Sequence, residues 1–144
     1  MIIDHVGIAI RSIERSIEHW QTVFGYQQVT EIVTNTRQKV RVVFLAKRGS
    51  LQVKLIEPPD STSPIHAFAQ RDGGLHHLCF RCESVDAEGA RLEALGLRII
   101  APPQPGEAFE DEGIAFVNVG DGLSIELIDT EQRAGLMHDD PASA

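Results

Sequence analysis

The sequence predicts an α+β fold in which two tandem βαβββ modules form an open, cup-like mixed sheet. The main observation is an internal repeat with a constant offset of 72 positions, half of the 144 residues. Three pairs of segments share it: IDHVGIAI with LHHLCFRC, VVFLA with IAFVN, and LQVKLIEP with LSIELIDT. Helix signals follow the first segment of each half, and apolar residues alternate with polar ones in the last segment of each half. Such a repeat indicates duplicated units that pack side by side, here around a pseudo-two-fold axis.

The first module, residues 1–58, reads as a strand, a helix and three further strands. In its first strand, large apolar residues alternate with small ones such as Gly7 and Ala9. Because successive side chains of a strand point to opposite faces, the small residues leave room on one side. A helix follows, with Ser12 as its expected N-cap and Gly25 just after its end.

The linker and the second module continue the pattern. Residues 59–74 form a turn-rich linker with a short helix, which we expect to begin at Pro64 with Ser63 as its N-cap. The second module, residues 75–130, repeats the order of the first, and Ser84 is the expected cap of its helix.

Length, charge and cysteine content limit the classes of function. A polar tail, residues 131–144, ends a chain that we expect to be a single domain over residues 1–144. The formal charge of −8 comes without a basic patch, which disfavours nucleic-acid binding. No run approaches the roughly 18 apolar residues of a membrane span, and we expect a soluble cytoplasmic protein. Cys79 and Cys82 fall on opposite faces of a strand, which is typical of unreactive structural thiols.

Four polar residues occupy matching positions in the two modules. His5 corresponds to His77, and Lys54 corresponds to Glu126. If the open faces of the modules form one cup, these side chains meet on its floor. Two imidazoles and a carboxylate from three strands suit Zn, Fe(II), Ni, Co or Mn. The alternative is that both histidines are hydrogen-bonded packing residues and that Glu126 is a half-exposed strand residue.

Other residues of the same faces predict the walls of the cup. Phe44 and Phe116 are related by the repeat, and we expect them to form an apolar surface against a substrate. Arg81 is the expected anchor for a substrate carboxylate. Gln52 shares a strand face with Lys54, so it is a further candidate for contact with a substrate or a metal.

These segments resemble the vicinal oxygen chelate superfamily, which includes glyoxalase I, methylmalonyl-CoA epimerase, extradiol dioxygenases and bleomycin-resistance proteins. The resemblance is closest to the epimerase branch, through IDHVGIAI, RQKVRVVFLA, SPIHAFAQRDGGLHHLCF and LSIELID, and it covers residues 2–130. It implies the vicinal oxygen chelate fold. It also implies a divalent metal held by His5, His77 and Glu126, with a Gln or Glu at the position that Lys54 occupies.

Lys54 is the main departure from that pattern, because a protonated ammonium has no lone pair and repels a divalent ion. Three outcomes are open. The metal stays on the three remaining ligands, Gln52 becomes the fourth ligand, or no metal binds and Lys54 pairs with Glu126 as a fixed cation. A carboxylate that some epimerases place on the third strand is also missing, with Val42 in its position.

The resemblance implies a metal-dependent isomerase or epimerase that moves a proton next to a carbonyl of a small acid or acyl thioester. A metal or Lys54 would hold the carbonyl oxygen, while Glu126 or another base moves the proton. One alternative is a dioxygenase or lyase with a 2-His-1-carboxylate metal site. Another is a metal-free, resistance-type binding protein with a structural Lys54–Glu126 pair. Each would act on a small molecule, and the resemblance implies a homodimer.

Overall fold

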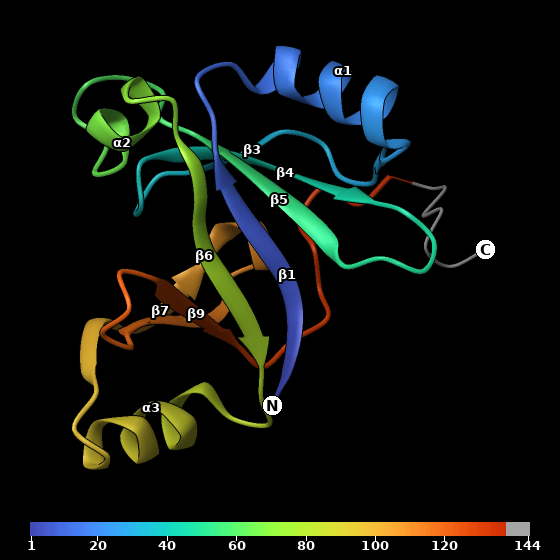
Figure 1. Cartoon of the computed structure of the whole chain (residues 1–144). Helices are drawn as coiled ribbons and strands as arrows, with labels where there is room; N and C mark the ends of the chain where they lie inside the picture. The colour runs from blue at the N-terminus through green and yellow to red at the C-terminus, as the bar shows by residue number, and fades with distance from the viewer. Residues whose placement is uncertain (138–144) are drawn as a thin grey trace.

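A computed structural model describes residues 1–137 and confirms the mixed α+β fold (Figure 1). Within these residues, nine strands form one sheet in the order β2-β4-β5-β1-β6-β9-β8-β7, with β3 paired to β4. No helix in this part of the chain has the length and apolarity needed to cross a membrane. The elements are β1 (Ile2–Ala9), α1 (Ile13–Phe24), β2 (Gln27–Gln28), β3 (Val33–Asn35), β4 (Val40–Ala46), β5 (Gln52–Glu57), α2 (His66–Gln70), β6 (Gly74–Arg81), α3 (Val85–Ala94), β7 (Arg98–Gly106), the 3₁₀ helix η1 (Glu107–Phe109), β8 (Glu112–Asn118) and β9 (Ser124–Ile128).

The two modules meet at the centre of the sheet, where β1 and β6 run antiparallel. Each of these strands has a parallel neighbour from its own module, β5 beside β1 and β9 beside β6. Gly7 lies opposite Lys54 in the first pair, and Cys79 lies opposite Glu126 in the second. The pairing register therefore repeats together with the sequence, and α1 and α3 lie at opposite ends of the molecule (Figure 1).

Both long helices begin where the sequence predicts. The Ser12 hydroxyl accepts a hydrogen bond from the backbone N–H of Arg15, and Gly25 ends α1 in the left-handed conformation. The Ser84 hydroxyl accepts one from the N–H of Ala87 at the start of α3. Each helix packs on its own half of the sheet over a separate apolar cluster. The two clusters leave the inner faces of the half-sheets free to enclose a common space.

The linker helix differs from its prediction. Helix α2 begins at His66 rather than at Pro64, and no side chain caps it. The Ser63 hydroxyl is buried and has no hydrogen-bond partner within residues 1–137, although its backbone carbonyl accepts from the N–H of His66. Ser63 therefore belongs to a turn and does not cap the helix.

The inner faces of both half-sheets share one apolar cluster, which includes Phe44. Helix η1 adds Phe109, whose side chain is fully buried in that cluster. The start of the polar tail packs over it, because the backbone N–H of Ala134 donates to the carbonyl of Ala108. The remainder of the predicted tail, residues 138–144, lies outside the described residues.

Gly7 on β1 makes room for a histidine of the neighbouring strand. A Cβ atom at this position would lie 2.0 Å from Cε1 of His77, which is opposite in the β1–β6 pair. No real Cβ contact is that short, so the ring of His77 occupies space that only a glycine leaves open. The small residues predicted on this strand face therefore serve to place His77.

We expect Gly7→Ala to lower the free energy of unfolding by about 1–3 kcal/mol, because the added methyl group overpacks a filled site. Urea unfolding followed by circular dichroism measures this change. The control is Gly89→Ala in α3, where a Cβ atom meets nothing within 4 Å. That variant should gain about 0.5–1 kcal/mol from the better helix propensity of alanine. Wild-type stability of Gly7→Ala would contradict the close approach of His77.

Candidate functional site

Four side chains from four strands meet on the floor of the cup: His5 from β1, Lys54 from β5, His77 from β6 and Glu126 from β9. All are buried, with exposed fractions of 2% or less. The Glu126 carboxylate is central, 3.1 Å from Lys54 Nζ, 3.3 Å from His77 Nε2 and 3.6 Å from His5 Nε2. The structure thus brings together the four residues that the repeat singles out. It rules out the half-exposed Glu126 of the alternative interpretation.

A carboxylate fixes the orientation of His5. Asp4 Oδ1 lies 2.7 Å from His5 Nδ1, so this nitrogen carries a proton and donates it to Asp4. Burial lowers the pKa of His5 and outweighs the opposing effect of Asp4, so the ring is neutral near pH 7. Its Nε2 then carries a lone pair. That atom is buried and has no hydrogen-bond partner in the described part of the chain.

His77 has a similar unpaired nitrogen, but another histidine holds its ring. His77 Nδ1 lies 2.9 Å from His76 Nδ1, so one of the two donates to the other. Burial lowers the pKa of His77 well below its ordinary value, and its buried Nε2 has no hydrogen-bond partner among residues 1–137. Strand alternation places His76 on the opposite face, yet His76 also lines the cavity above the floor.

The Lys54 ammonium lies between a carboxylate and two aromatic rings. Its Nζ is 3.1 Å and 3.4 Å from the two oxygens of Glu126. The ring centres of Phe109 and Phe44 are 4.9 Å and 5.8 Å from it, and aromatic faces attract a cation. These contacts offset part of the cost of burying the charge. Phe44 therefore supports Lys54 from within the core and does not line the cavity.

Glu126 is ionised although it is completely buried. Burial alone would raise its pKa, but the Lys54 ammonium and the two histidines outweigh this effect and lower the pKa to about 2. Two unit charges about 4 Å apart attract by roughly 4 kcal/mol at an effective dielectric of 20. Removing either charge would leave the other uncompensated in the core.

A cavity of about 320 Å³ opens above the charged pair. Lys54 and Glu126 line it, and its wall is mostly apolar. The wall includes Val40, Ile56, Ile65, Ile100 and Phe116. Phe116 also meets the ring of His77 edge-on, with 5.8 Å between ring centres. A few polar groups in an apolar cavity of this size are typical of a small-molecule site.

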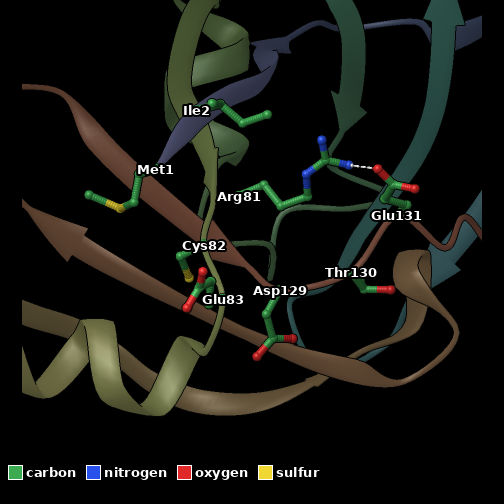
Figure 2. Close-up of a pocket in the computed structure, with 8 residues that line it drawn as sticks. All are labelled: Met1, Ile2, Arg81, Cys82, Glu83, Asp129, Thr130 and Glu131. Carbon is green, nitrogen blue, oxygen red and sulfur yellow. Dashed lines mark hydrogen bonds and ion pairs between the residues drawn. The ribbon is translucent and has the colours of Figure 1, made fainter.

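Two residues predicted to contact a ligand lie elsewhere. Arg81 is at the end of β6, where it forms an ion pair with Glu131 beside a separate surface depression (Figure 2). Gln52 lines a third depression together with Asp4. Neither lines the cavity above Glu126. The expectation that Arg81 anchors a substrate there is therefore corrected, because alternation fixes the face of a strand but not the depth along it. Gln52 does not contact the cavity either, and its role as a fourth metal ligand stays a prediction.

Sequence reasoning missed three residues that complete the floor. Arg133 of the tail is 9% exposed, forms an ion pair with Asp4, and stacks over Phe44 and Phe109 at 4.5 Å and 5.1 Å from the ring centres. Asp4 directly precedes His5, and this adjacency is a signal that could have identified it. Nothing in the sequence points to Arg133 or Phe109. Both lie in segments outside the repeated strands, and their positions depend on how those segments fold.

The two cysteines are free thiols. Burial raises the pKa of Cys79, which pairs with Glu126 in the β6–β9 register. Burial also raises the pKa of Cys82. Both thiols are therefore protonated at neutral pH, as expected for cysteines without a nucleophilic role.

Two modules that enclose one cup, β1 to β5 with α1 and β6 to β9 with α3, carry two histidines and a glutamate on its floor. The first differs from the predicted βαβββ order by one additional short strand. This arrangement defines a vicinal oxygen chelate type of protein. The family model described as the Glyoxalase/Bleomycin resistance protein/Dioxygenase superfamily matches residues 4–116. The chain belongs to this superfamily.

Methylmalonyl-CoA epimerases are among the proteins that are similar to this chain. The mitochondrial enzyme of Mus musculus is 31% identical over 101 residues, which are 69% of this chain but only 56% of that protein. The crystal structure of the Mycobacterium tuberculosis enzyme superposes with a TM-score of 0.79 at 32% identity, covering 88% of this chain and 86% of the other. A variant of the Streptomyces coelicolor enzyme in complex with 2-nitronate-propionyl-CoA gives 0.78 at 27% identity, covering 90% and 96%.

The donor atoms of the floor fit a divalent metal, but the position of Lys54 does not. Single ligand atoms of His5, His77 and Glu126 lie within 4.8 Å of one another, and this set suits several divalent metals. Lys54 Nζ, however, already holds the same carboxylate at 3.1 Å. Charges of +2 and +1 about 4 Å apart repel by roughly 8 kcal/mol at an effective dielectric of 20. The set as a whole therefore disagrees with the metal that the family pattern implies.

The lowered pKa of Glu126 predicts a specific loss of stability in acid. Because the pKa is about 2 in the folded chain and 4.5 ordinarily, the stabilisation is complete above about pH 5 and disappears as the pH falls towards 2. We expect the wild type to lose about 3 kcal/mol more than Glu126→Gln over this interval. Urea unfolding at a series of pH values measures it. Parallel curves for the two proteins would contradict an ionised Glu126.

Proposed function

We propose that the chain is an epimerase-type isomerase that moves a proton at the carbon next to the carbonyl of an acyl thioester. The observation that carries this proposal is a buried ammonium–carboxylate pair, Lys54 and Glu126, on the floor of a largely apolar cavity. The similarity to methylmalonyl-CoA epimerases supports the reaction class. The Streptomyces coelicolor relative, in complex with 2-nitronate-propionyl-CoA, supports an acyl-CoA as the kind of substrate.

Lys54 is the proposed partner of the carbonyl oxygen. Removal of a proton next to a thioester carbonyl places negative charge on that oxygen, and a fixed cation within hydrogen-bonding distance stabilises it. Lys54 has three N–H donors, of which Glu126 engages only part. Since the ammonium lines the cavity, a donor can turn towards a substrate. The enclosed site strengthens this interaction by excluding water.

Glu126 is the proposed base. A carboxylate with a pKa of about 2 is a weak base while Lys54 is its partner. When the ammonium donates to the carbonyl oxygen of a bound substrate, its hold on Glu126 weakens and the basicity of the carboxylate rises. Substrate binding would therefore activate the base that it needs. His76 lines the same cavity, and burial lowers its pKa, so it is a neutral imidazole that can take a proton on its own side of the substrate. It delivers a proton in the opposite direction only after it has been protonated from solvent.

A binding protein without catalytic activity is the second candidate, because the Lys54–Glu126 pair it requires is present. In that case the pair would be structural. The dioxygenase or lyase alternative needs a metal on the three ligands, and the position of Lys54 does not favour it. The bound metal, the cytoplasmic location and the homodimer stay predictions from the family resemblance.

Deuterium exchange tests the proposed reaction. The full chain is incubated in D₂O with methylmalonyl-CoA and with other acyl-CoA thioesters that carry a branched α-carbon, and mass spectrometry follows incorporation of deuterium. We expect exchange with the wild type, a loss of about 100-fold or more in Lys54→Met and Glu126→Gln, and wild-type exchange in Lys47→Gln. Lys47 is a suitable control because it donates to the Phe24 carbonyl at the surface. Tight binding of a thioester without any exchange would favour the binding protein instead.

Arg37 is the proposed contact for an acidic group of the substrate, in place of Arg81. It lines the cavity, and its Nη1 is 3.8 Å from carboxylate oxygens of Glu107 and Asp111, too far for a hydrogen bond to either. We expect Arg37→Ala to raise the KM for an acidic acyl thioester about tenfold, because a charge-assisted hydrogen bond is lost. Arg81→Ala is the matched control and should leave the KM unchanged. The reverse result would restore Arg81 as the anchor.

A further inference from the structure

The floor of the cup gathers one carboxylate and two histidine nitrogens that lack a hydrogen-bond partner within residues 1–137. Asp4 holds the proton of His5 on Nδ1, which leaves Nε2 as an acceptor. His77 Nδ1 shares a hydrogen bond with His76 Nδ1, in which either ring can be the donor. Both Nε2 atoms lie beside the Glu126 carboxylate, at 3.6 Å and 3.3 Å. Neither has a hydrogen-bond partner in the described part of the chain.

Lys54 brings a cation to this set from within the chain. It occupies the position related to Glu126 by the 72-residue repeat, so the pseudo-two-fold arrangement directs the two side chains towards each other. Its ammonium contacts both carboxylate oxygens and lies near the rings of Phe109 and Phe44, and the Lys54 side chain is only 2% exposed. A surface lysine could turn into solvent, whereas this one is enclosed.

The charges of the floor are already balanced without a metal. Lys54 compensates Glu126, and Arg133 compensates Asp4. Glu126 is the one carboxylate among the described residues that line the cavity. A divalent ion would therefore add two positive charges to a neutral cluster, with no further anion to compensate them.

We infer that the Lys54 ammonium is an internal cation that takes the place of a divalent metal, and that the cup accepts a metal only when Lys54 is replaced. This inference concerns what the floor binds, so it stands or falls separately from the proposed proton transfer. It predicts that one substitution creates a metal site. Lys54→Gln is suitable, because glutamine is uncharged and its amide oxygen can act as a ligand.

The test is Co²⁺ binding by the full chain as wild type, Lys54→Gln and Lys47→Gln, each first dialysed against a chelator. Equilibrium dialysis gives the metal content per chain, and the visible spectrum of bound Co²⁺ reports its ligands. We expect Lys54→Gln to bind about one ion per chain, about 100-fold or more tightly than the wild type. Lys47→Gln should match the wild type. Adding Glu126→Gln to Lys54→Gln should remove the gain.

Two results would overturn the inference. One is a wild type that binds Co²⁺ as tightly as Lys54→Gln; the other is a folded Lys54→Gln, judged by circular dichroism, that binds no more than the wild type. If Lys54→Gln does not fold, the wild type and Glu126→Gln decide the question. Tight binding by the wild type that Glu126→Gln abolishes would refute the inference, and equally weak binding by both would support it.

Discussion

The ion pair between Lys54 and Glu126 is the interaction on which the rest of the site depends. Each residue is buried where an isolated charge would be strongly unfavourable. The two are 72 positions apart in sequence and 3.1 Å apart in space. Since Lys54 is on β5 and Glu126 is on β9, the pair joins the two modules at the centre of the cup. The orientation of the neighbouring groups follows from it.

Duplication explains why one module carries a cation where the other carries an anion. Positions related by a two-fold axis face each other across that axis, so two equal charges would repel and opposite charges attract. The histidines obey the same constraint in another way. His5 and His77 also face each other, with 5.7 Å between ring centres, and burial keeps both neutral. Two symmetry-related positions can therefore both be charged and buried here only because their charges are opposite.

Features set by local sequence patterns could be predicted, whereas features set by contacts between distant segments could not. The repeat, the helix caps Ser12 and Ser84 and the four floor residues were predictable, because each is a local pattern or its duplicate. Arg133 was not, because its place depends on a tail that folds back over the cup. Arg81 was assigned to the correct strand but not to the correct depth, since the period of a strand identifies faces only. The repeat therefore predicts the scaffold more fully than the contents of the cavity.

The two departures from the epimerase pattern, Lys54 and Val42, have one electrostatic explanation. A divalent ion held by one carboxylate leaves excess positive charge, and a second carboxylate at position 42 of β4 would compensate it. A single ammonium is neutralised by Glu126 alone, so no acid is needed at position 42. Val42 is 1% exposed within the apolar cluster of the cup, where an unpaired carboxylate would be strongly unfavourable. If Lys54 takes the place of a metal, as inferred above, the absence of that acid belongs to the same charge balance.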